Sequence, residues 1–231
     1  MKRNLIFLIA VCLCAAAFAR KFEVKTGTFS KLVVQDNLNV VYEHQPACEG
    51  IATFEWDNSH ADALMFVNNG KDKLTVMISP DFIGKNIEFP VVYIYSEFLR
   101  ELESSSESTV TVKKPARCPE LKIKLFGNGT IDVSGLDANK ITAAQMTGHG
   151  LIKMTGKTAD AVYKVAGAGH IDACGLEAVK VSCHVFGGGE IHCHPIEEIK
   201  LKGLGSTTVF YSGNPTKVKK QGIGKLVKVG D

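Results

Sequence analysis

The segment GAGHIDACG, residues 167–175, has close counterparts elsewhere in the chain. Similar segments occur at 127–135 (GNGTIDVSG), 148–156 (GHGLIKMTG) and 187–195 (GGGEIHCHP). They share the pattern Gly-x-Gly-x-Ali-x-x-x-Gly, where Ali is an aliphatic residue, and they recur roughly every 20 residues. A period of about 20 to 50 residues is typical of solenoids and other arrays of stacked units. The chain therefore contains a structural repeat.

Two positions of the repeat behave differently, and the difference indicates which side chains are buried. Weaker copies of the repeat begin at Gly205 and Gly222. The position four residues after the first glycine is aliphatic in all six copies: Ile131, Ile152, Ile171, Ile191, Val209 and Leu226. The residue after it varies freely: Asp132, Lys153, Asp172, His192, Phe210 and Val227. Apolar residues are those most often found inside proteins, so the first set is predicted to line a core and the second to face solvent.

The segments between the glycines predict strands. Alternating polar and apolar residues at 121–126 (LKIKLF) and 181–186 (VSCHVF) are typical of β-structure. No segment after residue 20 shows a helical period, which argues against helical solenoids and strand–helix horseshoes. Glycine adopts positive φ at little cost, as sharp corners require. Stacked coils of about 20 residues, each hydrogen-bonded to the next, form a parallel β-helix.

The first residues predict export. Lys2 and Arg3 precede an uncharged apolar run, which ends in the small-x-small sequence Ala17-Phe18-Ala19. These are the features of a secretory signal peptide cleaved after Ala19. The alternatives are a membrane anchor, for which the run is shorter than the ~20 residues required, and a lipid-modified cysteine. The expected location is the periplasm, the outer cell surface or the exterior.

We therefore divide the chain into three parts: a signal peptide (1–19), an N-terminal β region (20–100) and a Gly-repeat β-helix (101–231). The N-terminal region contains strand-like segments such as FPVVYIYS (89–96), without the clear glycine repeat. It is either a set of degenerate coils of the same solenoid or a separate β layer that caps it.

Charge and cysteine content limit the possible partners. The formal net charge is +3 and approaches zero once Lys2 and Arg3 are removed, so charge does not favour a nucleic-acid partner. No later apolar segment is long enough to cross a membrane. Beyond the signal peptide the cysteines are odd in number and match no small disulfide scaffold. Cys183 and Cys193 are predicted to be small core residues.

Three further segments resemble one known family. They are FSKLVVQDNLNVVYEH (29–44), LRELESSSESTVTVKK (99–114) and YSGNPTKVKKQGIGKL (211–226). With the glycine repeats, they resemble the putative auto-transporter adhesin family with a head GIN domain, which comprises bacterial envelope proteins. The resemblance implies an all-β, right-handed parallel β-helix in the envelope or outside the cell, and it implies no established activity. Thr207 departs from the family pattern, which has glycine there.

Two segments approximate binding motifs. GHGLIKMTGKT (148–158) is close to a phosphate loop, but its spacing is one residue too long and no helix follows. The pattern G-x-G-x-x-D at 127–132 and 167–172 resembles calcium-binding nonapeptides. In those proteins the repeat recurs every nine residues, so that ligands from adjacent turns converge on one ion. In this chain the repeat recurs roughly every 20 residues. Neither segment is assigned a ligand.

A third candidate is the triplet His192-Cys193-His194, with His184 and Cys183 one coil earlier. Alternate residues place His192 and His194 on one face of a strand, opposite Cys193, where two imidazoles could share Zn²⁺. The interpretation we favour is two exposed polar residues beside a core cysteine. We therefore assign no metal ligand, no cofactor and no catalytic residue.

Catalysis on this scaffold is the main alternative. Polysaccharide lyases and hydrolases also use parallel β-helices, but they need clustered carboxylates or a base assisted by arginine or calcium. Asp132 and Asp172 should lie two coils apart with Lys153 between them. The serines of SSSES (104–108) are interpreted as corner or surface residues. The sequence thus predicts a noncatalytic, adhesin-like binding or scaffolding protein, whose partner is a polysaccharide or another envelope component.

The chain ends in a lysine-rich segment. Lysines on a terminal strand discourage pairing with another chain, and the alternative is a binding site for a polyanion or a membrane surface. The residues are Lys217, Lys219, Lys220, Lys225 and Lys228.

Overall fold

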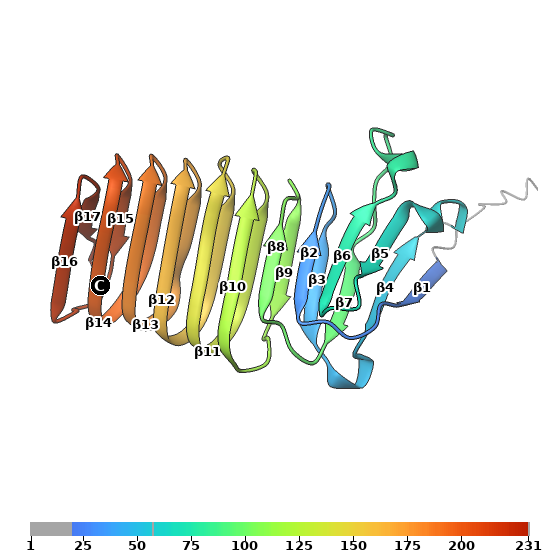
Figure 1. Cartoon of the computed structure of the whole chain (residues 1–231), viewed down its shortest axis with the longest axis horizontal. Helices are drawn as coiled ribbons and strands as arrows, with labels where there is room; N and C mark the ends of the chain where they lie inside the picture. Colours follow the sequence, from blue (N-terminus) through green and yellow to red (C-terminus); the bar gives the residue numbers. More distant parts are fainter. Residues whose placement is uncertain (1–19, 57, 231) are drawn as a thin grey trace, which may run out of the picture.

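The computed structural model describes residues 20–56 and 58–230, so the predicted signal peptide lies outside the described residues. Over these ranges, seventeen strands form one continuous sheet wound into an elongated solenoid (Figure 1). The three helices in the same ranges are short 3₁₀ turns: η1 (Pro46–Cys48), η2 (Asn58–Ala63) and η3 (Pro80–Phe82). No helix there is long and apolar enough to span a bilayer. The structure confirms an all-β parallel solenoid with an N-terminal β region.

Long, bent strands make the regular part of the solenoid. Each pairs in parallel with the next, with register partners about 20 residues apart, such as Ile131 with Ile152 and Ile141 with Ala161. Because these two pairs lie on different faces, one strand serves both faces by bending at a corner. The strands are β10 (Cys118–Phe126), β11 (Thr130–Thr147), β12 (Leu151–Gly167), β13 (His170–Gly187) and β14 (Glu190–Gly205).

The predicted aliphatic column is confirmed for five of its six residues, whereas Leu226, in register with Val209 on the last coil, is only partly buried. Ile131, Ile152, Ile171, Ile191 and Val209 are in consecutive register and fully buried. Burial of each such side chain stabilises the fold by about 1.5–3 kcal/mol. The neighbouring variable position faces outward, as expected from the alternation of side chains along a strand.

One corner of each regular coil is built on glycine, and we call it the glycine corner: Gly127, Gly148, Gly167, Gly187 and Gly205. At Gly187, φ is +145° and a Cβ atom would lie 2.4 Å from the carbonyl oxygen of Gly167. The coils that carry Gly167 and Gly187 therefore approach too closely for a side chain at Gly187. Thr207, two residues after this corner, is buried and donates a hydrogen bond from Oγ1 to the Gly187 carbonyl at 2.8 Å.

The serines of residues 104–108 form part of a buried corner. The Oγ of Ser104 accepts a hydrogen bond from the Ser106 amide at 3.2 Å, and the Oγ of Ser106 accepts one from the Ser108 amide at 2.9 Å. Ser104 and Ser106 are fully buried. The surface interpretation is therefore wrong for these two residues, which replace backbone acceptors inside the turn.

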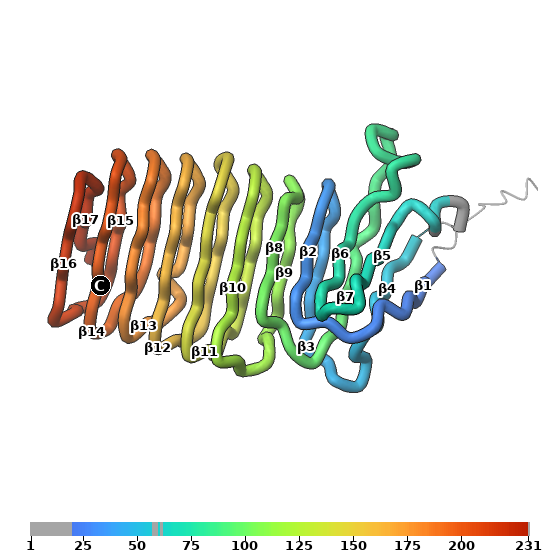
Figure 2. The backbone as a smooth tube through the Cα atoms, viewed as in Figure 1, coloured from blue at the N-terminus to red at the C-terminus, as the bar shows by residue number. Residues whose placement is uncertain are grey.

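The coils at the N-terminal end do not follow the order of the sequence. The coil made of β2 and β3 pairs in parallel with β6 and β7 on one side and with β8 and β9 on the other. Figures 1 and 2 show this blue coil between two later parts of the chain. The strands are β2 (Lys31–Val34), β3 (Val40–His44), β6 (Lys73–Ile78), β7 (Val92–Ser96), β8 (Glu101–Ser104) and β9 (Thr109–Lys113).

An antiparallel layer closes this end. β4 (Ile51–Trp56) pairs antiparallel with β1 (Arg20–Lys25) and β7, and β5 (Leu64–Asn68) pairs antiparallel with β6. Within it the Phe54 ring stacks on Phe22 and on Phe66, at centroid distances of 5.1 and 6.2 Å. The region 20–100 thus supplies both solenoid coils and an antiparallel layer.

The C-terminal end carries an exposed edge. Its strands are β15 (Thr208–Tyr211), β16 (Lys217–Gly222) and β17 (Lys225–Lys228). Lys220 is in register with the buried Leu201, yet every residue of β16 is exposed. Lysine at a core-facing position of the last coil leaves a surface that another solenoid cannot readily extend.

Candidate functional site

Two adjacent outward columns bring polar and aromatic side chains together just after the glycine corner. One column contains His170 and Glu190, which are register partners on β13 and β14. The other contains Asp172, His192 and Phe210, on β13, β14 and β15. Both columns face away from the aliphatic core, because they flank its isoleucines along each strand.

Three rings from these columns form a continuous stack, which we call the ring stack (His170, His192 and Phe210). The centroids of His170 and His192 are 4.8 Å apart at an interplanar angle of 34°. His192 lies 4.7 Å from Phe210 at 32°. Each ring comes from a different coil, so the spacing of the sheet places them in contact.

Glu190 lies against both imidazoles. Its Oε2 atom is 3.7 Å from Nδ1 of His170 and 3.6 Å from Nε2 of His192. The Nε2 atom of His192 is buried and has no hydrogen-bond partner among the described residues. A buried polar atom without a partner costs about 1–3 kcal/mol, so this nitrogen is a point of unsatisfied bonding capacity.

The surroundings of His170 favour its neutral imidazole. Burial lowers the pKa of His170 below its usual value, and the neighbouring His192 lowers it further. The carboxylates of Glu190 and Asp172 act in the opposite direction but do not reverse the shift. At neutral pH His170 therefore retains a nitrogen lone pair that can accept a proton or bind a metal.

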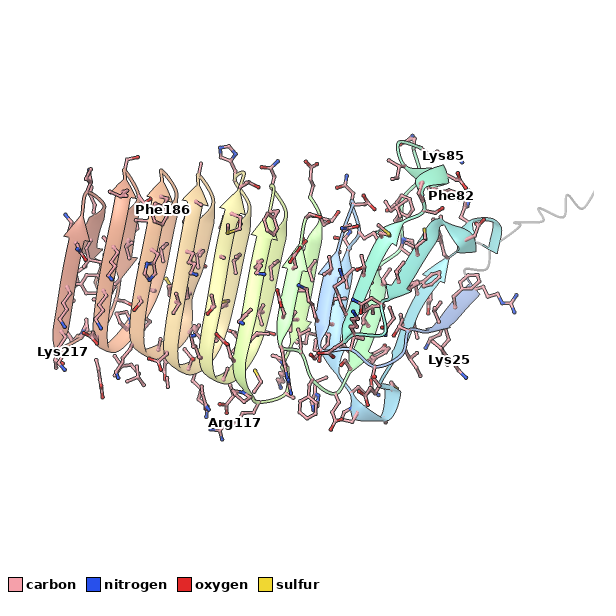
Figure 3. All side chains as sticks on the ribbon, viewed as in Figure 1. Lys25, Phe82, Lys85, Arg117, Phe186 and Lys217 are labelled. Carbon is pink, nitrogen blue, oxygen red and sulfur yellow. The ribbon has the colours of Figure 1, made fainter. Side chains whose placement is uncertain are left out.

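An apolar ridge lies on the other side of the glycine corner. It consists of Phe186, Leu204 and Ile223, whose exposed fractions are 57%, 65% and 73%. Phe186 and Leu204 are register partners, and the pairing of Gly203 with Gly222 places Ile223 next in line. The next outward column on this face carries Lys164, His184 and Lys202. Figure 3 shows Phe186 near this corner, whereas Lys217 lies at the opposite edge of the solenoid.

The family can now be assigned. Residues 28–215 match the model of the family described as "Putative auto-transporter adhesin, head GIN domain". The chain belongs to this family. No curated protein matches the chain.

Solved structures give the same fold for the GIN-domain chain. A putative adhesin from Bacteroides fragilis is 21% identical, with a TM-score of 0.80, and the match covers 91% of this chain and 96% of that one. A putative lipid binding protein from Parabacteroides distasonis is 18% identical, with a TM-score of 0.66 and coverages of 93% and 98%. A putative adhesin from Parabacteroides merdae is 18% identical, with a TM-score of 0.64 and coverages of 94% and 97%. Their identities are low enough that the likeness concerns the fold.

Of the histidines and cysteines that the sequence suggested as a cluster, only His192 belongs to the ring stack. His194 is hydrogen-bonded elsewhere, with its Nδ1 atom 2.8 Å from the Ser212 hydroxyl. His184 lies elsewhere, in a column between Lys164 and Lys202. Its pKa is lowered mainly by burial and further by the positive charges of these two lysines. Cys183 and Cys193 are buried, which confirms their prediction as core residues of this GIN-domain protein.

Sequence reasoning missed His170 and Glu190. Each stands three residues after a glycine of the corner, Gly167 and Gly187, so the alignment of repeats already placed them on adjacent coils. The imidazoles that the sequence suggested as shared ligands, His192 and His194, are two residues apart on one strand. The contacts that form this cluster run across coils.

The two candidate catalytic carboxylates lie where the repeat predicts. Asp132 pairs in register with Lys153, which pairs with Asp172. The Asp172 carboxylate accepts a hydrogen bond from the Cys174 amide at 3.2 Å. The phosphate-loop-like residues 148–158 run from the glycine corner into β12, without a helix whose N–H groups could surround a phosphate.

Proposed function

We propose that the mature chain is an exported, noncatalytic binding or scaffolding protein of the cell envelope, with an adhesin-like role. One observation carries this proposal: a constant aliphatic interior supports outward columns whose side chains change from coil to coil. The spacing between coils is fixed at about 4.8 Å, so the face presents a rigid, nonrepeating pattern of groups. Such a surface suits recognition of an extended partner, such as a polysaccharide or another envelope component. The family match supports an envelope or surface role.

The carboxylate arrangement argues against glycoside cleavage. Paired carboxylates are about 5–5.5 Å apart in retaining enzymes and about 6.5–9.5 Å apart in inverting enzymes. Asp132 and Asp172 are separated by a complete coil, which places them roughly 10 Å apart by the ladder spacing. Lys153 stands between them in register.

A panel of envelope and host polysaccharides tests this function. The purified protein should be retained by at least one immobilised polysaccharide without releasing reducing ends or unsaturated products. Turnover that is lost in the Asp132→Ala/Asp172→Ala double variant would identify an enzyme and overturn the proposal. Lack of retention on every surface polysaccharide and envelope extract would contradict a binding role.

An anionic lipid surface is a second candidate, which the apolar ridge specifically favours. Three exposed apolar side chains in register, beside the column of Lys164 and Lys202, combine an insertable edge with positive charge. One structural relative is named a putative lipid binding protein, and here that name supports a proposal only.

Vesicle co-sedimentation tests the second candidate. We expect the protein to bind vesicles containing phosphatidylglycerol, and the Phe186→Ser/Leu204→Ser variant to bind at least tenfold more weakly. The control is Phe98→Ser, which alters an exposed aromatic residue away from the ridge. Equal binding by parent and ridge variant would show that the ridge does not contact lipid.

A further inference from the structure

We propose that His170, Glu190 and His192 form a binding site for a divalent transition-metal ion, with Zn²⁺ as the ion best matched to the ligands. The three residues belong to two successive coils on the outward face. Two imidazoles and one carboxylate are a set of protein ligands that zinc uses in sites with an open coordination position. The inference depends only on these side chains and is independent of the polysaccharide or lipid partner.

The distances between the ligand atoms are close to those of a formed site. One ligand atom from each residue lies within 4.8 Å of the other two, and the Glu190 Oε2 atom lies 3.7 and 3.6 Å from the two imidazole nitrogens. Zinc ligands at about 2.0–2.2 Å in a tetrahedral arrangement are roughly 3.3–3.5 Å from one another. Small rotations of partly exposed side chains would therefore bring all three atoms onto one ion, with no movement of the backbone.

The second observation is the unsatisfied nitrogen of His192. Its Nε2 atom is buried beside Glu190 and forms no hydrogen bond within the described part of the chain. Phe210 packs on one side of the ring and His170 lies on the other. The two neighbouring rings thus hold the imidazole in place, with its Nε2 atom facing the Glu190 carboxylate. A bound ion would supply the missing partner.

The charges around the site favour a cation. Glu190 lies between the imidazoles, and Asp172 is the register partner of His192 on the preceding coil. Lys153 is next in that column, on the far side of Asp172 from the site. His184, in contrast, lies in a column between Lys164 and Lys202, where a cation would be repelled. Three protein ligands leave a fourth position open to water or to a donor from a partner.

Calorimetric titration with zinc sulfate, after treatment of the purified protein with EDTA and dialysis, tests the site. We expect one Zn²⁺ per chain with a dissociation constant in the micromolar range or below. His170→Gln and His192→Gln should each weaken binding by at least tenfold, whereas the matched controls His149→Gln and His194→Gln should leave it unchanged. Affinity should also fall as the pH is lowered through the histidine range, because zinc and protons compete for the same nitrogens.

A spectroscopic readout locates the ion independently of affinity. Co²⁺ in place of Zn²⁺ should give the intense visible bands of a tetrahedral site, and these bands should be lost in His170→Gln. Melting curves of the metal-free variants should match that of the parent protein, which separates loss of a ligand from loss of the fold. Absence of binding at 100 μM Zn²⁺, or binding that survives in His170→Gln but is lost in His194→Gln, would overturn the proposal.

Discussion

Replacing Ile171 with Asp is expected to abolish cooperative folding of the protein. Ile171 is fully buried between Ile152 and Ile191 in the aliphatic column. The substitution loses about 1.5–3 kcal/mol of apolar burial and adds a penalty of several kcal/mol for an unpaired buried charge. Single domains have free energies of unfolding of only about 5–15 kcal/mol. The combined loss therefore equals most or all of the stability of the fold. Circular dichroism during thermal or urea unfolding measures the effect.

Two controls make the result interpretable. The outward neighbour change Asp172→Asn should alter stability by no more than about 0.5 kcal/mol, as surface substitutions usually do. Ile171→Val keeps the apolar character and should cost about 0.5–1.5 kcal/mol. If Ile171→Asp melted as cooperatively as the parent and at the same temperature, the stacking of equivalent residues would be wrong.

Substituting alanine for Gly187 should produce the second largest loss of folding stability among the changes that we predict. A Cβ at this position would lie 2.4 Å from the oxygen and 2.8 Å from the nitrogen of Gly167, while φ is +145°. Both contacts are with backbone atoms of the preceding coil, so they can be relieved only if the two coils separate. We expect at least ~3 kcal/mol of destabilisation, because local strain of about 1–3 kcal/mol is added to broken ladder hydrogen bonds.

Gly127 is the matched control for Gly187. It occupies the same corner in an earlier coil and has φ of +100°, but an added Cβ would meet no atom within 4 Å. Gly127→Ala is therefore expected to destabilise the fold only through its backbone conformation, by about 1–2 kcal/mol. Urea unfolding of the two variants compares these costs. Equal losses would show that the close approach of coils at the corner contributes nothing beyond conformational strain.

The regular coils could be predicted from the sequence, since one residue type recurs at one position. The isoleucines at 131, 152, 171 and 191 mark the interior because only apolar side chains fit a shared column. The placement of β2 between β6 and β8 could not be predicted in the same way. Its partners lie about 40 and 70 residues away, as in the pairings of Lys31 with Lys73 and with Glu101. Ladder hydrogen bonds join backbone groups that are the same in every residue, so the sequence does not indicate which distant strands pair.

The candidate site was only half predictable for a related reason. The triplet at 192–194 drew attention because its ligands are neighbours in the chain. The structure pairs His192 instead with residues of the column beside it, His170 and Glu190. Contacts across coils depend on which outward side chains turn toward one another, and that choice depends on packing against rings such as Phe210.

The inserted coil makes the two ends of the solenoid mechanically unequal. At the C-terminus, β17 pairs only with β15 and β16 only with β14 among the described strands, so tension there would open a single ladder at a time. Tension on the N-terminus must first shear β1 from β4 and then extract β2 from between two parallel neighbours, which breaks two ladders together. We therefore expect the chain to unfold at a lower force when it is pulled at its C-terminus than when it is pulled at its N-terminus.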